Sequence, residues 1–302
     1  MTSLSRRTLV LGSAAVALSA CGSSKSNGGA NKSNGSTTGP ASKVTAAGGS
    51  TAKPGDLVAI RFFKSGVAAA NVPYRYTFGL GTADGTLETK GPDSVSFRVL
   101  DKAGAAEVVP ATTVARHAKD LARPYWPLTT TLPAGTYQVE LTVGTRKLEP
   151  AFIDVATPDA ISVLSPGANL PALLTPTVKD AAGVKPICTR QPACPLHDVS
   201  LADALKANKP IAFLIATPAY CQTAICGPVL DVLLKHRTDA ITFIHAEVYT
   251  DDSLQISTEA VHTFGLDYEP ALFLAKADGT IVDRLDVIFD SDDVAAALAK
   301  LV

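Results

Sequence analysis

Two largely apolar runs constrain most strongly what this chain can fold into. They are PIAFLIA at 210–216 and AITFIHAEV at 240–248. Runs without polar alternation are typical of strands that are buried on both faces of a sheet. Stretches with the apolar spacing of helices lie beside them, SLADALKANK at 200–209 and PVLDVLLKHR at 228–237. The sequence therefore predicts helices alternating with buried strands from Val199 onward.

The remaining C-terminal sequence continues this alternation. A third helix is predicted over 251–265, ended by Gly265, because glycine commonly follows the last turn of a helix. Two strands joined at Asp278-Gly279 come next, since Asp-Gly is a strong hairpin signal. The stretch SDDVAAALAKLV predicts a closing helix with acidic residues in its first turn.

The region 54–157 has a different pattern, short alternating runs broken by turn signals such as Asp84-Gly85. The runs DLVAIRFF, SVSFRVLD, TYQVELTV and AFIDVA predict strands, with no long helical stretch between them. The segment LPAGTYQVELTV resembles a late hairpin of immunoglobulin-like sandwiches, but the Cys-Trp-Cys framework of the antibody type is missing. We expect an all-β sandwich with Trp126 in its core.

The N-terminus has the pattern of an export signal. Arg6 and Arg7 precede an apolar segment that is too short to span a bilayer. The tetrapeptide LSAC resembles the lipobox of bacterial lipoproteins, which implies lipid on Cys21 and an extracytoplasmic protein anchored to the bacterial cell membrane. SRRTLVL also resembles a twin-arginine signal, and an ordinary cleaved signal, with Cys21 accidental, is the alternative.

Composition divides the chain further. Residues after Cys21 are rich in Gly, Ser, Asn and Lys, which predicts a flexible tether. A net charge of −1 and the lack of a basic run argue against nucleic acid as a partner. The predicted divisions are a signal peptide at 1–20, a tether at 21–53, a sandwich at 54–157, a proline-rich linker at 158–198 and an α/β domain at 199–302.

Four cysteines remain besides Cys21, and they form two local pairs. In an exported protein such pairs predict disulfides. We interpret Cys188 and Cys194 as a structural disulfide that pins the linker, and we expect no metal there. Two alternatives stay open for this pair: a metal site that includes His197, or a second dithiol. His245 and His262 are interpreted as packing or surface residues.

A family resemblance appears around the second pair, Cys221 and Cys226. NKPIAFLIATPAYC resembles the approach to a thioredoxin-type active site, and GLDYEPALFLAKADGTIVDRL resembles the stretch that carries the cis-proline of that family. The resemblance implies an α/β thioredoxin-like domain over 199–302, with Cys221 and Cys226 as catalytic cysteines and Pro270 cis against them. Together with CTRQPACPLHDVSL, the cysteine block also resembles an uncharacterised group of exported bacterial thioredoxin-domain proteins.

The sequence departs from that family at several points. Four residues rather than two separate Cys221 from Cys226, and the buried acid that accepts a proton in thioredoxin has no counterpart in PIAFLIA. Glu247 is the possible replacement. In another register CGPV replaces the usual CGPC, so that Cys226 is the nucleophile and Val229 stands in place of its partner. TPAYCQTAIC also resembles Q-type peroxiredoxins, and a cysteine pair with a distant histidine resembles the copper-handling Sco type.

Helix geometry bears on whether Cys221 and Cys226 can join. Five residues of α-helix rise about 7.5 Å, whereas a disulfide requires Cα atoms within about 6.8 Å. If a helix begins at Pro228, the cysteines lie in a loop, which suits a permanent disulfide. If a helix begins at Pro218, it must unwind on bridging, which suits a redox switch.

These patterns together predict a membrane-anchored, extracytoplasmic thiol–disulfide oxidoreductase. Its partners would be protein thiols or disulfides, or a membrane redox partner, and it would need no organic cofactor. The alternative is a binding or structural lipoprotein with two inert disulfides.

Overall fold

The computed structural model describes Lys53 and residues 55–301. The predicted signal peptide, the lipidation residue Cys21 and all of the predicted tether except Lys53 lie outside the described residues. The described residues all belong to one compact unit.

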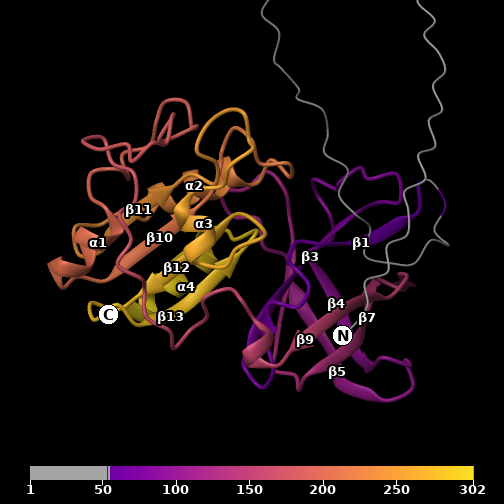
Figure 1. Cartoon of the computed structure of the whole chain (residues 1–302). Coiled ribbons are helices and arrows are strands. Elements are labelled where there is room, and N and C mark those ends of the chain that lie inside the picture. Colours follow the sequence, from indigo (N-terminus) through magenta and orange to yellow (C-terminus); the bar gives the residue numbers. More distant parts are fainter. Residues whose placement is uncertain (1–52, 54, 302) are drawn as a thin grey trace, which may run out of the picture. The chain divides into compact units, whose positions relative to one another are not determined.

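The first half of the described chain is all β (Figure 1). One sheet has the strand order β1-β3-β6, and the other has the order β2-β9-β7-β4-β5, with β8 paired to β7. Aromatic and aliphatic side chains of the two sheets share one core, in which Trp126, Phe78 and Phe97 are buried. The strands are β1 Leu57–Arg61, β2 Ala68–Ala69, β3 Tyr74–Thr82, β4 Ser94–Asp101, β5 Glu107–Ala115, β6 Trp126–Thr130, β7 Gly135–Val143, β8 Arg146–Lys147 and β9 Ala151–Ala156.

The second half contains a four-stranded mixed sheet in the order β11-β10-β12-β13. β10 and β11 are parallel, while β12 and β13 run antiparallel to their neighbours. The short helices α1 and α3 pack against one face of the sheet, and α2 and α4 pack against the other face. The elements are α1 Leu201–Ala204, β10 Ile211–Ile215, α2 Cys226–Lys235, β11 Thr242–Ala246, α3 Glu259–Thr263, β12 Ala271–Ala275, β13 Ile281–Asp286 and α4 Ser291–Leu298.

The predicted fold class, an α/β thioredoxin-like domain after an immunoglobulin-like sandwich, is wrong. The structure is mostly β, with 34% strand and 15% helix in several sheets, and it shows no clear α/β thioredoxin fold. Helices form a smaller part than the sequence pattern predicted. The predicted helix over 251–265 forms only at Glu259–Thr263. Asp251 accepts a hydrogen bond from the backbone N–H of Ser253 at 2.9 Å, a turn that competes with helix at its start.

Residues 161–200, which we call the strap, have almost no regular secondary structure. Backbone hydrogen bonds join the strap to the mixed sheet and its loops. The backbone N–H groups of Gly167 and Leu170 donate to the carbonyls of Ile281 and Gly279, each at 2.9 Å. Farther along, the N–H of Lys185 donates to Thr250 at 2.7 Å, and the carbonyl of Leu196 accepts from His245 at 3.1 Å. The strap therefore brings its cysteines to β11.

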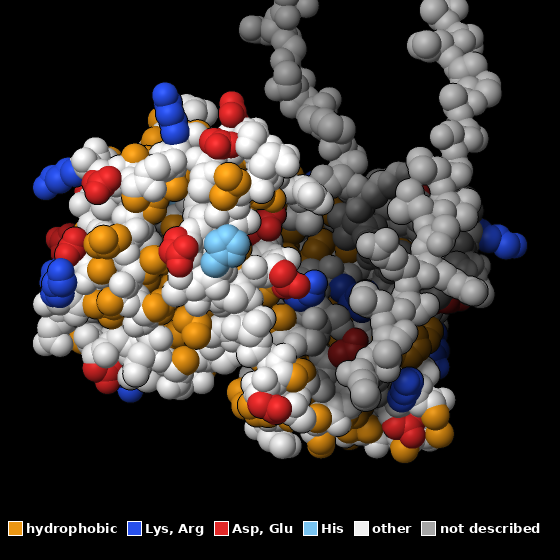
Figure 2. Space-filling view, in the orientation of Figure 1, with side chains coloured by type: hydrophobic (Ala, Val, Ile, Leu, Met, Phe, Trp, Pro, Cys, Tyr) orange, Lys and Arg blue, Asp and Glu red, His pale blue; other side chains and the backbone are white. Residues whose placement is uncertain are grey.

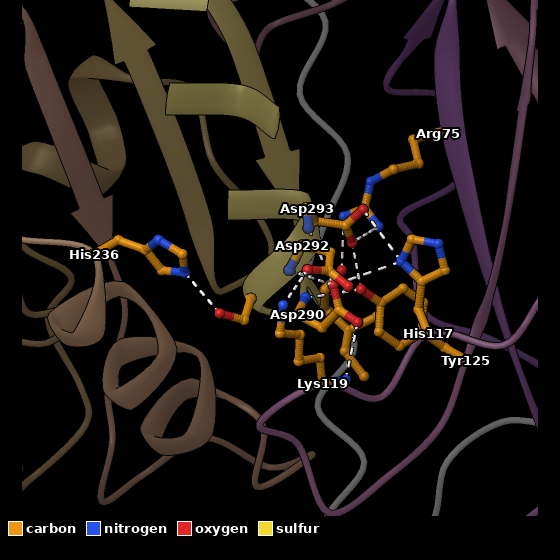
Figure 3. Close-up of polar contacts among 10 residues, drawn as sticks. Arg75, His117, Lys119, Tyr125, His236, Asp290, Asp292 and Asp293 are labelled. Carbon is orange, nitrogen blue, oxygen red and sulfur yellow. Dashed lines mark hydrogen bonds and ion pairs between the residues drawn. The ribbon is translucent and has the colours of Figure 1, made fainter. Parts of the chain in front are cut away.

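A polar cluster joins the loop before β6 to the start of α4 (Figure 3). Asp290 caps α4, accepting from the N–H groups of Asp292 and Asp293. His117 Nδ1 lies 3.5 Å from Asp290 and 3.4 Å from Asp293. The Tyr125 hydroxyl donates to Asp293 and accepts from the N–H of Asp290. We call these residues, with Arg75 and Lys119, the α4 cluster.

The surface carries charges of both signs. Acidic and basic side chains are interspersed over the face seen in Figure 2, in keeping with 27 basic and 28 acidic residues in the sequence. Among the described residues, no helix has the length and apolar character needed to cross a membrane.

Candidate functional site

The segment between β10 and α2 carries the second cysteine pair. After the buried strand ends, the N–H of Cys221 donates to the carbonyl of Thr217 at 3.0 Å, and the N–H of Ala224 donates to that of Cys221 at 3.0 Å. Helix α2 then begins at Cys226. Pro228 fits in the first turn, because the first N–H groups of a helix have no partner within it. The cysteines are thus separated by a loop and not by a helix.

The two sulfur atoms are close but differ in exposure. Cys221 Sγ, Cys226 Sγ and a carboxylate oxygen of Glu269 all lie within 4.8 Å of one another. Cys226 is fully buried, whereas Cys221 is partly exposed, and all four described cysteines are free thiols. Because Cys226 and Val229 are both inaccessible, the register with Cys226 as nucleophile does not fit this geometry.

The environment separates the acidities of the two thiols. A hydrogen bond with Cys226 is the largest cause that lowers the pKa of Cys221, to about 5; burial opposes it, and Thr223 together with the N–H groups at the start of α2 assists. The Thr223 hydroxyl lies 3.2 Å from Cys221 Sγ. Burial, followed by the neighbouring Cys221, raises the pKa of Cys226 well above its usual value. Cys221 is therefore the group that exists as a thiolate.

Glu269 is a site residue that the sequence analysis missed. Burial raises the pKa of its carboxyl to about 7, and the charge on Cys221 adds to the effect. The signal available was its position directly before Pro270, whose peptide bond with Glu269 is cis, as the resemblance implied. A carboxyl with a pKa near neutrality, within reach of both sulfurs, can accept and return a proton.

Glu247, named from the sequence as the possible proton acceptor, lies elsewhere. Its Oε1 accepts from the N–H of Thr189 at 2.6 Å and from the Thr189 hydroxyl at 2.9 Å. That hydroxyl in turn accepts from the N–H of Ala219 at 3.0 Å. Glu247 is buried, and its other oxygen has no hydrogen-bond partner. It links the strap to the loop of Cys221, but it is not in the group formed by the two sulfurs and Glu269.

The first cysteine pair lies among histidines. Cys188, Cys194, His197 and His245 are all buried, and one potential ligand atom from each lies within 4.8 Å of the others. His197 was a candidate ligand from the sequence, but His245 was interpreted as packing. The strap and β11 bring the two histidines together, with His245 Nδ1 3.2 Å from His197 Nε2. The disulfide between Cys188 and Cys194 stays a prediction.

Arg123 is a second residue that sequence reasoning missed. It precedes β6 and donates from Nη1 to the carbonyl of Thr223 at 3.0 Å. The all-β half of the chain thus holds the cysteine loop directly. No sequence signal indicated this contact, because the two residues are 100 positions apart.

One cavity of about 570 Å³ lies elsewhere, lined by residues that include Tyr74, Arg75, Val163 and Arg284. No cysteine lines it. The guanidinium group of Arg284 already donates hydrogen bonds to Asp286 and to the backbone carbonyl of Leu164. This cavity therefore adds no group to either cysteine cluster.

No protein-family model matches this chain, and no curated protein matches it.

Proposed function

We propose that the protein catalyses thiol–disulfide exchange with Cys221 as nucleophile and Cys226 as resolving cysteine. The observation that carries the proposal is the asymmetry of the pair. Cys221 is partly exposed and has a pKa of about 5, and Cys226 is buried beside it together with Glu269. A partly exposed thiolate with a protonated partner is the arrangement that exchange requires.

The reduction of a substrate disulfide has two steps. The Cys221 thiolate attacks one substrate sulfur, forming a mixed disulfide and releasing the other sulfur as a thiolate, which takes up a proton. Glu269 then accepts the proton of Cys226, whose sulfur attacks Cys221. The second substrate sulfur leaves as a thiolate and takes up that proton from Glu269. The substrate gains two electrons and two protons, and the protein ends with a Cys221–Cys226 disulfide. A protein dithiol restores the reduced form by the reverse steps.

The rival function is a permanent disulfide between the same residues. The loop between Cys221 and Cys226 would accommodate such a bond without unwinding α2. However, a permanent bond has no use for hydrogen bonds that stabilise a thiolate or for a carboxyl with a pKa near 7. These features favour the redox function.

The proposed setting is outside the cytoplasm, with the chain held at the membrane by lipid on Cys21. The substrates would be exported proteins with disulfides or a membrane redox partner, and Pro270 would border the groove that receives an extended substrate. The resemblance of LSAC to a lipobox supports the anchor. Labelling with radioactive palmitate in a bacterial host tests it: we expect label in the wild type and none in Cys21→Ala.

Trapping of the mixed disulfide tests the exchange itself. In Cys226→Ser the second step cannot occur, so the variant should accumulate a covalent adduct with a disulfide-containing peptide. Cys221→Ser, which retains Cys188 and Cys194, should form none and is the matched control for adducts at those two residues. As much adduct in Cys221→Ser as in Cys226→Ser, or no adduct in Cys226→Ser, would exclude Cys221 as the nucleophile.

A further inference from the structure

We propose that Cys188, Cys194, His197 and His245 form a zinc site that fastens the strap to β11. Three of these ligands come from the strap within ten residues, and the fourth comes from near the C-terminal end of β11. Two thiolates and two imidazoles are a ligand set that zinc prefers in structural sites.

The distances between the ligand atoms agree with tetrahedral coordination. The two ring nitrogens are 3.2 Å apart. Cys194 Sγ lies 3.3 Å from His197 Nε2 and 3.5 Å from His245 Nδ1, and Cys188 Sγ lies 3.8 Å from His245 Nδ1. A tetrahedron with Zn–S of about 2.3 Å and Zn–N of about 2.0–2.1 Å has edges of roughly 3.3–3.8 Å. These four edges agree with such a tetrahedron, and the four ligand atoms all lie within 4.8 Å of one another, so one zinc ion can be held among them.

Neighbouring groups orient two of these ligands, His245 and Cys188, for a metal, whereas the buried Nδ1 of His197 has no hydrogen-bond partner among the described residues. His245 Nε2 lies 3.0 Å from the carbonyl oxygen of Ala216, which can only accept, so this nitrogen carries the proton. Its Nδ1 then presents a lone pair to the cluster. The N–H of Cys194 donates to Cys188 Sγ at 3.3 Å, which stabilises a thiolate. A partner on the far nitrogen of a ligating histidine is typical of zinc sites.

Burial distinguishes this site from a chance meeting of side chains. The exposed fractions are 4% for Cys188, 5% for Cys194, 2% for His197 and 0% for His245. A disulfide would account for the two sulfurs but not for two histidines directed at them in the interior. One ion accounts for all four groups.

The chemistry of the site is structural rather than catalytic. Four protein ligands leave no open position for substrate, and the burial of all four excludes it. Thr189, next to Cys188, bonds to Glu247 and Ala219. The ion would therefore fix the part of the strap that supports the loop before Cys221.

Zinc uptake by the full chain tests the site. The protein is purified in detergent, reduced without oxygen and stripped of metal, and zinc sulfate is added in competition with a chromophoric chelator. We expect one zinc per chain. Cobalt(II) added instead should give the intense d–d absorption of tetrahedral cobalt, with thiolate charge-transfer bands. Reduced protein with four free thiols that takes up neither metal would overturn the proposal.

Amino-acid substitutions test whether these four residues bind the metal. His197→Gln should lower the affinity for zinc by more than the roughly 10- to 100-fold that is lost when a hydrogen-bond partner of a ligand is removed. Cys221→Ser/Cys226→Ser is the control, and it should keep one zinc; loss of zinc there would move the metal to the other pair and refute the assignment. The proposal also fails if peptide mapping of the protein as isolated shows a Cys188–Cys194 disulfide and no zinc, or if only copper(I) binds. The cobalt spectrum of the wild type decides the question even if a variant does not fold.

Discussion

At the scale of single residues, the chemistry depends on how differently two cysteines are solvated. Cys226 is buried and Cys221 is partly exposed, so burial raises the pKa of Cys226, while hydrogen bonds lower that of Cys221 to about 5. The sequence analysis named both residues from their spacing and family resemblance. It did not find Glu269, because only the folded chain shows that the carboxyl reaches the sulfurs.

The pH dependence of alkylation tests the state of Cys221. Its rate with iodoacetamide should rise through a pH of about 5 and be nearly constant from pH 6 to 8, because the thiolate is the reactive form. In Cys226→Ala the largest cause of the low pKa is gone, so the inflection should move upward. Mass spectrometry of the Cys221 peptide measures the rate. An inflection above pH 8 in the wild type would contradict the account.

Glu269→Gln tests the proton acceptor. The wild-type rate at which Cys226 resolves a mixed disulfide should rise through about pH 7, because the carboxylate is the base. The variant should lose this inflection and be slower by on the order of 10²-fold at pH 8. Single-turnover release of a fluorescent thiol measures it. Glu247→Gln, checked for folding by circular dichroism, should keep the inflection; the opposite result would make Glu247 the acceptor.

At the scale of elements, the apolar runs predicted their strands well. The apolar spacing predicted the short helices less well. PIAFLIA and AITFIHAEV contain β10 and β11 because a short, largely apolar run between turn signals favours a buried strand. The helix ended by Gly265 is much shorter than predicted, since turn hydrogen bonds at Asp251 compete with it. The strap could not be predicted at all. Its position depends on backbone hydrogen bonds with residues far along the chain, which leave no periodic pattern.

A substitution at Gly265 tests how closely the strap approaches the end of α3. It has φ of +65°, and a Cβ there would lie 2.2 Å from the carbonyl oxygen of Ser162 in the strap. Gly265→Ala should therefore lower the free energy of unfolding by more than about 2 kcal/mol, from left-handed strain and the clash together.

A matched glycine separates the two causes. Gly183 has φ of +82° with no atom within 4 Å of an added Cβ. Gly183→Ala should cost only about 1 kcal/mol. Urea denaturation of both variants measures the difference, and equal costs would show that the strap does not approach Gly265 as described.

At the scale of the whole molecule, the all-β half contacts the half with the mixed sheet at several places. Arg123 bonds to the cysteine loop, and the α4 cluster bonds to the start of α4 (Figure 3). The sequence predicted the order of most strands but not these contacts, which unite residues more than 90 positions apart. The fold class was wrong for a related reason. The periodicity of the sequence identifies possible helices, but tertiary packing determines how many residues of each one are helical.

The α4 cluster should make stability depend on pH. Asp290 and Asp293 raise the pKa of His117 to about 9, against about 6.5 in an unfolded chain. The imidazolium therefore stabilises the fold fully below about pH 6.5, and this contribution is lost as the pH rises through 9. Because the side chain is 29% exposed, we expect a loss of about 1–2 kcal/mol rather than the full value of the shift.

Urea denaturation at pH 6 and pH 9.5 measures that loss. His117→Gln should remove the dependence, and His262→Gln, an exposed histidine outside the cluster, should retain it. If the wild type is equally stable at both values, His117 does not hold the two halves together.

The reduction potential of the Cys221–Cys226 couple tests the central claim most directly. It is measured by equilibrating the zinc-loaded protein with dithiol buffers of known potential and counting free thiols in the peptides that contain Cys221 and Cys226 by mass. Exchange chemistry requires a bond that partners can reduce, so we expect a potential above about −300 mV. A potential below about −300 mV would contradict the account and leave a permanent structural disulfide.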